Sequence, residues 1–253
     1  MTISSRIALV TGGSRGLGRS TVLSLANRGV HSIFTYHSNR EEAGSVTALV
    51  QQAGAKAVAL QLDTGNVATF DAFVGSVRQA LQQLGASSLD YLVNNAGNSN
   101  HNLIVNTSEA EVDALYNVHF KGVYFLTQKV LPVIKDGGRI VNLSSGLTRF
   151  SMPGMAAYAS MKGAIEVLTR YLATELGARV TTVNTVAPGA IATDFGNSRV
   201  RDNPEVKRQI ASGTALGRVG VAEDIGPMIA SLLSDENRWV NGQRIEVSGG
   251  VFL

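Results

Sequence analysis

The regular alternation of two hydrophobic patterns constrains the fold of this chain more than any other feature. Residues 7–10 form a continuous apolar run, which is typical of a strand buried on both faces. Residues 46, 49, 50 and 53 are instead apolar at helical spacing, and Gly54 follows as a helix end. Because the two patterns keep alternating, we expect an α/β fold. It is a single doubly wound, Rossmann-type domain whose seven-stranded, mostly parallel sheet has helices on both faces.

The expected elements can be placed by residue number. Strands are expected at residues 7–10, 32–36, 57–62, 89–93, 139–143, 180–186 and 245–247. Helices are expected to end near residues 28, 54, 84 and 132–137, and a further one to span about 156–177. Ser38 with Glu41, and Ser108 with Glu111, match the Ser-x-x-Glu capping box that opens a helix. Within one domain of residues 1–253, the region of about 188–216 after the sixth strand is expected to form a loop and helix at the ligand-binding edge of the sheet.

Composition and charge exclude several functional classes. The chain has 253 residues, no cysteine and a net charge of +3, so disulfides and thiolate metal sites are excluded. The four histidines, at 31, 37, 101 and 119, show no metal-ligand spacing, and we predict no metal site. We expect His119 on a helix surface or at an interface. Basic residues are scattered rather than clustered, which argues against a nucleic-acid partner.

Cellular location is read from apolar runs and from the N-terminus. No apolar run approaches the roughly 18 residues that a membrane span needs, so we expect no membrane partner. Residues 1–6 lack the charged, apolar and small-residue zones of a secretory signal. We therefore expect a cytoplasmic protein.

A glycine-rich turn lies between the first expected strand and the first helix. In residues 11–18, Thr-Gly-Gly-Ser-Arg-Gly-Leu-Gly, Gly12 permits the turn and Gly16 lets the backbone approach a pyrophosphate. Gly18 allows close packing of helix and strand, and the helix N-terminus supplies amide donors. We predict a dinucleotide site here, with Ser14, Arg15 and Leu17 in the loop, rather than a simple tight turn.

The end of the second strand distinguishes the two nicotinamide cofactors. An NAD site needs an acidic residue about 20 positions after the glycine loop to bind the ribose 2′-hydroxyl. This chain instead has Tyr36, His37, Ser38 and Arg40 around that point. Arg40 and Arg15 suit a 2′-phosphate, which arginine binds in a bidentate manner. We therefore predict NADP(H) rather than NAD(H); the alternative is that both arginines only face solvent.

Tyr158 and Lys162 are four residues apart on an expected helix, so their side chains project from one face. An ammonium beside a phenol favours the phenolate, and we expect the pKa of Tyr158 to be lowered. Such a phenol suits a general acid or base. Ser145, at the end of the fifth strand, can add a hydroxyl to the same pocket.

These motifs together resemble the short-chain dehydrogenase/reductase family over essentially the whole chain. The resemblance includes the glycine loop and the motifs Asn94-Asn95-Ala96-Gly97, Asn117, Ser145, Tyr158, Lys162, Pro188-Gly189 with Thr193, Asn241-Gly242 and Gly249-Gly250. Within the family, the chain most resembles the 3-oxoacyl-carrier-protein reductase-like carbonyl reductases.

The resemblance implies a reaction and roles for four catalytic residues. Hydride passes between the nicotinamide of NADP(H) and the carbon of a small-molecule carbonyl or alcohol, so a ketone or 3-oxoacyl thioester becomes a secondary alcohol, or the reverse. Tyr158 is the general acid or base, and Lys162 lowers its pKa and binds the nicotinamide ribose. Ser145 binds the substrate oxygen. Asn117 holds a water that links Lys162 to solvent.

The resemblance also implies the remaining cofactor contacts. Asp63 and Thr64 meet the adenine edge, and the small segment Asn95-Ala96-Gly97 lets the backbone run close to the ribose. The nicotinamide is covered by Pro188, Gly189, Ile191 and Thr193. Asn98, where many relatives have an apolar residue, makes the pocket mouth polar and leaves the substrate undefined.

Two further expectations concern assembly and an alternative function. In relatives, the long helix after Ser108 and the Tyr158 helix form paired faces, which implies a homotetramer or homodimer. Trp239 and Phe252 are candidates for burial against a partner. The alternative function is a non-catalytic NADP-binding sensor or interaction protein on the same fold, although such a protein is free to lose Tyr158 or Lys162 and this chain has both.

Overall fold

A computed structural model describes residues 6–253. The expectation of no secretory signal concerns residues 1–6, of which 1–5 lie outside the described residues. Seven strands form one sheet in the order β3-β2-β1-β4-β5-β6-β7. The strands are β1 Ile7–Val10, β2 His31–Tyr36, β3 Ala57–Gln61, β4 Leu89–Asn94, β5 Ile134–Leu143, β6 Thr182–Pro188 and β7 Arg244–Val247. Every neighbouring pair within this sheet is parallel, which confirms the fold class and extends "mostly parallel" to fully parallel.

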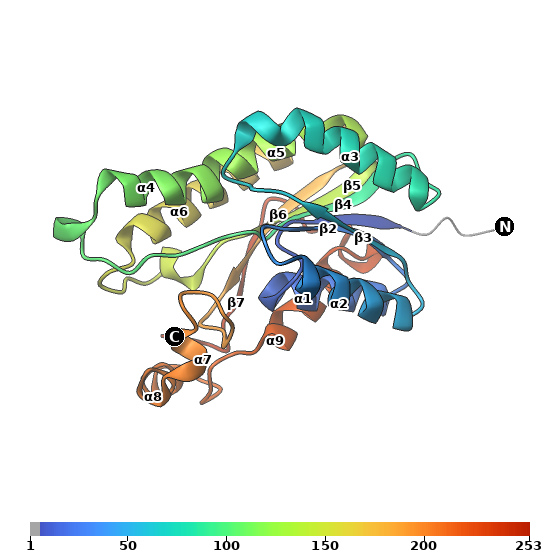
Figure 1. The fold of residues 1–253 in the computed structure, drawn as a ribbon. Helices are drawn as coiled ribbons and strands as arrows, with labels where there is room; N and C mark the ends of the chain where they lie inside the picture. The colour runs from blue at the N-terminus through green and yellow to red at the C-terminus, as the bar shows by residue number, and fades with distance from the viewer. Residues whose placement is uncertain (1–5) are drawn as a thin grey trace.

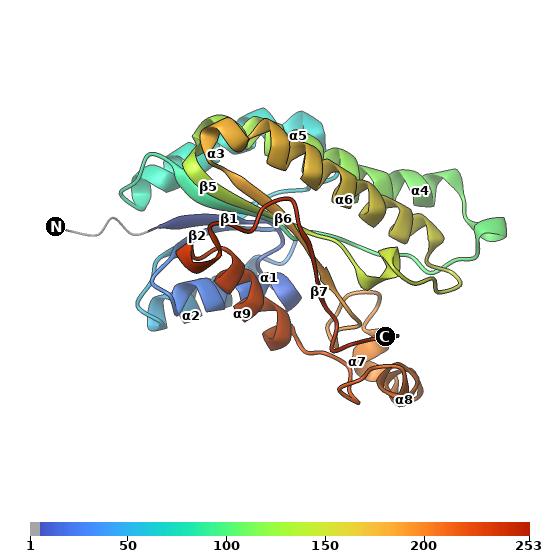
Figure 2. The same ribbon diagram turned by 180° about the vertical axis from the view of Figure 1, so that it is seen from behind.

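Helices cover both faces of the sheet. They are α1 Gly16–Ala26, α2 Arg40–Gln52, α3 Phe70–Gln83, α4 Glu109–Tyr116, α5 Gly122–Val130, α6 Ala156–Glu175, α7 Arg199–Asp202, α8 Pro204–Ser212 and α9 Ala222–Leu232. Figure 1 shows α3 to α6 above the sheet and α1, α2 and α9 below it. The same two layers are visible from behind in Figure 2, where α7 and α8 lie apart near the C-terminus.

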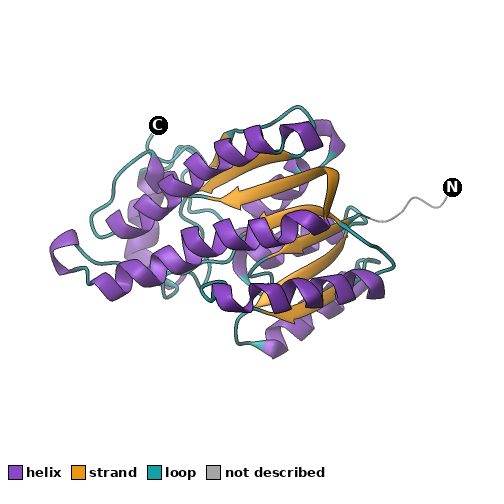
Figure 3. Cartoon of the chain, turned by 90° about the horizontal axis from the view of Figure 1, so that it is seen from above, coloured by secondary structure: helices purple, strands orange, loops and turns teal. Residues whose placement is uncertain are grey.

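The period-two alternation of side chains along the strands creates two cores. In β1, Ala8 and Val10 belong to the core between the sheet and α1, α2 and α9. Ile7 and Leu9 belong to the core between the sheet and α3, α5 and α6. All four side chains are essentially inaccessible to solvent. The continuous apolar run predicted from sequence is therefore needed because each face of the strand packs on a helix layer. Figure 3 shows, from above, the nearer of these layers lying over the strands.

Several element boundaries differ from the sequence-based expectation. Asn39, not Ser38, caps α2, since its side chain accepts from the amide of Glu42 at 3.1 Å; the predicted Ser38 capping box is wrong. The Ser108–Glu111 box is confirmed. The expected sixth strand begins two residues later, at Thr182, because Val180 has a left-handed φ of 54°.

The expected long helix is interrupted. A π-helix over Asn117–Lys121 separates α4 from α5 and widens the helical turn at this point. The region 188–216 contains the two short helices α7 and α8. Among residues 6–253, no helix is long and apolar enough to cross a membrane.

Candidate active site

The glycine loop follows β1 at the edge of the sheet where all strands have their carboxyl ends. Gly12 and Gly16 have φ values of +65° and +53°, a conformation that residues with a side chain rarely adopt. A Cβ added to Gly18 would lie 2.1 Å from the oxygen of Gly12, so α1 can pack on the loop only with glycine there. The loop occupies the switch point of the sheet, where β1 is flanked by β2 and β4. It therefore has the shape and position of a phosphate cradle.

Asn95 and Thr11 support this loop from the next strand. The hydroxyl of Thr11 accepts from the amides of Asn95 and Ala96 at 2.9 and 3.0 Å. The side-chain nitrogen of Asn95 donates to the oxygens of Thr11 and Gly12 at 2.8 and 3.1 Å. Asn95 thus fixes the backbone of the cradle, a role that the sequence-based reading of a close backbone approach missed.

The residues predicted at the 2′-phosphate lie after β1 and β2, which are adjacent strands. Arg15 is the N-cap residue of α1, and Arg40 is the first residue of α2; both are exposed. Tyr36 is half-buried at the end of β2, whereas His37 and Ser38 are exposed, and the His37 oxygen accepts from Gln61 at 2.9 Å.

Asp63 and Thr64 follow the edge strand β3. The Asp63 carboxylate accepts from the amide of Gly65 at 2.8 Å and thereby closes its own turn. The backbone oxygen of Thr64 would lie 2.1 Å from a Cβ at Gly122, the first residue of α5. This contact fixes the loop against α5, beside the glycine cradle.

Ser145, Tyr158 and Lys162 are buried together. Their exposed fractions are 9%, 7% and 5%. Tyr158 and Lys162 lie one turn apart on α6, and the Nζ atom of Lys162 is 5.7 Å from the centre of the Tyr158 ring. The Lys162 ammonium donates to the oxygen of Leu143, the last residue of β5, at 2.7 Å. The structure therefore brings together three of the four residues predicted to be catalytic.

The electrostatics of this cluster differ from the expectation. Burial raises the pKa of the Tyr158 phenol above its ordinary value, and the Ser145 hydroxyl partly offsets this by hydrogen bonding. Burial also lowers the pKa of Lys162 to about 7. The predicted lowering of the pKa of Tyr158 by Lys162 is wrong for the protein alone, because desolvation of the phenolate dominates and Ser145, not Lys162, opposes it.

Asn117 and His119 lie in the same π-helix but contact different parts of the chain. The Cβ of Asn117 is 3.9 Å from the place of a Cβ on Gly65, so this residue lies against the loop after β3. His119 is 1% exposed, and its ring packs edge-on against Tyr158 with centroids 5.2 Å apart. The expectation of a surface histidine is wrong. No signal in the sequence revealed this, because a π-helix changes the directions of the side chains within it.

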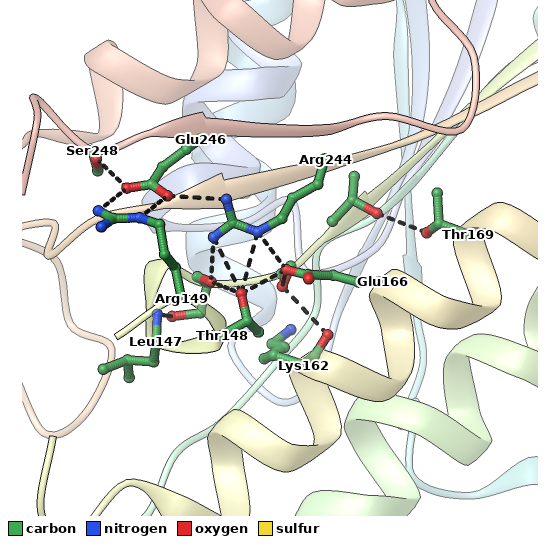
Figure 4. A network of polar contacts seen from close by, with 12 residues as sticks. Leu147, Thr148, Arg149, Lys162, Glu166, Thr169, Arg244, Glu246 and Ser248 are labelled. Carbon is green, nitrogen blue, oxygen red and sulfur yellow. Dashed lines mark hydrogen bonds and ion pairs between the residues drawn. The ribbon is translucent and has the colours of Figure 1, made fainter. Parts of the chain in front are cut away.

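The loop that carries Ser145 is tied to β7 by a polar network, shown in Figure 4. One carboxylate oxygen of Glu166, on α6, accepts from Ser144 and Thr148 at 2.7 Å and from Arg244 at 2.8 Å. A second guanidinium nitrogen of Arg244 donates to the oxygen of Ser145 at 3.3 Å. Sequence reasoning missed this network; the only signal was that Glu166 follows Lys162 by four residues on the same helix face.

The segment after β6 closes over the cradle. Pro188 ends β6, and the amide of Gly189 donates to Val247 at 3.1 Å. Ile191 forms an isolated bridge with Gly220. The side chain of Thr193 would lie 3.7 Å from a Cβ on Gly16, which places the predicted nicotinamide cover beside the glycine loop.

Phe195, which was not predicted, extends this cover toward the catalytic cluster. Its ring centre is 5.8 Å from that of Tyr158, and its side chain is 43% exposed. It therefore forms an aromatic wall between Tyr158 and solvent. Within residues 6–253, no group of three or more His, Asp or Glu side chains is arranged to hold a metal ion.

Comparisons with known proteins agree with this geometry. Residues 12–252 match a family model described as enoyl-(acyl carrier protein) reductase. The chain is 37% identical to the 3-oxoacyl-[acyl-carrier-protein] reductase FabG of Staphylococcus aureus over 251 residues, which is 98% of this chain and 99% of that protein.

Solved structures are similar over their full length. The reductase LugOII, described as catalysing keto-reduction at C1 during lugdunomycin biosynthesis, superposes with a TM-score of 0.93 at 36% identity, covering 100% of both chains. The angucycline C-6 ketoreductase LanV, solved with bound NADP, gives a TM-score of 0.92 at 33% identity, covering 98% of this chain and 95% of LanV.

Proposed function

Since the chain belongs to the short-chain dehydrogenase/reductase family, and is an NAD(P)-dependent oxidoreductase acting on CH–OH and C=O groups, we propose that it reduces a ketone or 3-oxoacyl thioester with NADPH, or catalyses the reverse reaction. The observation that carries this proposal is the burial of Ser145, Tyr158 and Lys162 together at the sheet edge that also holds the glycine loop. The proposed unit is one catalytic domain over residues 1–253, with 188–216 as its substrate region.

The residues present fit NADP(H). Gly12 and Gly16 have positive φ values, and Gly18 leaves no room for a Cβ beside the oxygen of Gly12. The loop therefore turns tightly into the N-terminus of α1, which suits a pyrophosphate. Arg15 and Arg40 are exposed at the ends of adjacent strands, where two guanidiniums can bind a 2′-phosphate. The NADP bound to the similar protein LanV supports the same choice.

The remaining predicted residues complete the cofactor site in this proposal. Tyr36, His37 and Ser38 flank the 2′-phosphate, and Asp63 and Thr64 meet the adenine. The backbone of Ala96 and Gly97 runs close to the ribose. The nicotinamide is covered by Pro188, Gly189, Ile191 and Thr193. The cofactor supplies or accepts the hydride.

Proton transfer is assigned to Tyr158. Its raised pKa keeps the phenol protonated near neutral pH, as a general acid for reduction must be. The Ser145 hydroxyl, which forms a hydrogen bond with the phenol, holds the substrate oxygen beside it. Lys162, with a pKa near 7, can hold or release a proton at working pH and replenish the phenol.

Turnover and mutation test this proposal directly. Purified protein should oxidise NADPH when given ketones or 3-oxoacyl thioesters, and Tyr158→Phe should lower kcat by about 100-fold or more because the acid is lost. Tyr171→Phe is the matched control, since this 65% exposed tyrosine lies on the same helix. An unchanged kcat in Tyr158→Phe would exclude Tyr158 as the acid.

The alternative of a non-catalytic NADP-binding sensor makes a different prediction. It requires NADPH binding without turnover of any carbonyl in the panel. The burial of Tyr158 and Lys162 beside the cradle is a costly arrangement for a protein that only binds, since both groups lose hydration.

We also propose self-association through α4, α5 and α6. Large apolar or aromatic side chains are exposed on these helices, namely Tyr116, Tyr124, Val167 and Tyr171. Trp239 and Phe252 are 95% and 51% exposed and remain available to a partner. Light scattering should give the mass of a dimer or tetramer, and a monomer at micromolar concentration would contradict this assembly.

A further inference from the structure

His119 is a buried titratable residue that the proposed mechanism does not use. It lies in the π-helix Asn117–Lys121, and its ring meets the face of Tyr158 at an interplanar angle of 89°. Gly97 makes room for it, because a Cβ there would come within 2.7 Å of the imidazole. Two separate segments, the π-helix and the segment after β4, are thus shaped around this one ring.

The hydrogen bonds of His119 define its state. Its Nε2 atom is 2.6 Å from the backbone oxygen of Asn98 and 3.3 Å from the Asn98 amide nitrogen. The much shorter distance to the oxygen indicates that Nε2–H donates to it. Burial and the nearby Lys162 charge lower the pKa of His119 to about 3, so the ring is neutral at working pH. The Nδ1 atom is then an acceptor, and it is buried without a hydrogen-bond partner among residues 6–253.

The groups that face His119 suggest what this acceptor binds. They are Tyr158 and Lys162 of α6 and the backbone of Gly97 and Asn98. A buried acceptor without a partner is unfavourable, which favours a donor at Nδ1 in the working enzyme. Lys162 is the cation of this cluster and uses one of its three N–H groups on Leu143.

We propose that His119 is a positioning residue of the proton path, whose Nδ1 accepts a hydrogen bond from a water molecule that also contacts the Lys162 ammonium. This inference rests on the proposed function. It assigns to His119 the water-holding role that the resemblance implied for Asn117, because the buried acceptor without a partner is on His119.

The proton balance in the direction of reduction is as follows. Hydride addition leaves an alkoxide; the Tyr158 O–H bond breaks and a new O–H bond forms on the product. The phenolate regains a proton from the Lys162 ammonium, and the resulting amine takes one from the water, which solvent replenishes. One solvent proton reaches the product, and His119 stays neutral throughout.

Three variants separate the acceptor role from a packing role. His119→Phe keeps an aromatic ring beside Tyr158 but removes the acceptor, and His119→Gln restores an acceptor oxygen. We expect His119→Phe to lower kcat at least tenfold with KM changed less than threefold, and the fall of kcat with rising pH to begin at lower pH. His119→Gln should keep kcat within about threefold of wild type. The control His31→Gln, at the start of β2, should match wild type.

The outcomes are distinguishable. Wild-type kcat and pH profile in His119→Phe would overturn the inference, as would a tenfold loss in Asn117→Ala with His119→Phe unaffected. If His119→Phe does not fold, His119→Gln decides: near wild-type kcat supports the acceptor role, and a tenfold loss overturns it.

A second readout does not depend on turnover, so failure of the proposed function leaves it intact. In ¹⁵N-histidine-labelled protein with NADPH, the signal of His119, assigned by its loss in His119→Gln, should show a neutral Nε2–H ring near neutral pH. An Nδ1–H tautomer or an imidazolium would overturn the inference, whereas absence of turnover in the wild type would contradict only the proposed function.

Discussion

Glu166 and Arg244 form a 2.8 Å ion pair between α6 and β7, with side chains only 15% and 25% exposed. The same guanidinium also donates to the backbone oxygen of Ser145, so the pair joins the helix of Tyr158 to the loop of Ser145. In our proposal, a displaced Ser145 would weaken binding of the substrate oxygen. This pair therefore contributes to the geometry of the site as well as to the stability of the fold.

A double-mutant cycle measures this coupling. Because partly buried, charge-assisted hydrogen bonds contribute more than exposed ones, Glu166→Gln and Arg244→Met should show a coupling energy of about 1–2 kcal/mol in urea unfolding. The exposed pair Glu205–Arg208, with both side chains 76% exposed, is the control and should couple by less than about 0.5 kcal/mol. Equal coupling in the two pairs would show that burial of the Glu166 network has no energetic consequence.

Substitution of Gly18 tests the packing of the phosphate cradle. Gly18→Ala places a Cβ 2.1 Å from the oxygen of Gly12, so we expect a loss of about 3 kcal/mol in the free energy of unfolding and weaker NADPH binding. Gly75→Ala, in an exposed position of α3 with open space around it, should instead stabilise by about 0.5–1 kcal/mol. Fluorescence titration with NADPH and urea unfolding report both effects; a neutral Gly18→Ala would refute the close contact of α1 with the loop.

Arg15 and Arg40 determine the preference for NADP(H) in our proposal. Replacing both by alanine should weaken NADPH binding by about 10- to 100-fold, as expected for lost hydrogen bonds to a charged group, while NADH binding changes little. Arg28→Ala, exposed beyond the opposite end of α1, is the control and should bind both cofactors as wild type does. Parallel loss of NADPH and NADH affinity would show that the arginines do not read the 2′-phosphate, and turnover with NADH equal to that with NADPH would refute the preference itself.

The order of the elements and the location of the site follow from local signals. Apolar runs and helical spacing are properties of neighbouring residues, and parallel strands bring Gly12, Asn95, Ser145 and Gly189 to one edge of the sheet. β6 begins later than expected because Val180 has a left-handed conformation, and an apolar pattern does not reveal a single dihedral angle. The N-cap of α2 lies one residue later than expected, because Ser38 and Asn39 are both favourable N-cap residues.

The errors within the site arise from contacts between distant segments. A π-helix adds a residue to a helical turn, so the direction of Asn117 and His119 could not be read from a regular helix. The Glu166–Arg244 pair joins residues 78 apart, and the register of β7 against β6 decides that they meet. The raised pKa of Tyr158 depends on burial, which the spacing of Tyr158 and Lys162 does not reveal.

Lys162 makes the stability of the cofactor-free protein depend on pH. Its pKa is about 10.5 when unfolded and about 7 when folded, so between these values the unfolded chain binds more protons. Stability due to this group therefore rises with pH across this window, by up to about 1.4 kcal/mol per pH unit. In urea unfolding, the wild type should gain stability relative to Lys162→Met between about pH 8 and about pH 10. Relative to Lys129→Met, which removes a lysine paired with Asp71 at the surface, the wild type should show no such gain over this range. A difference between wild type and Lys162→Met that stays constant with pH would mean that the buried lysine titrates as it does in water.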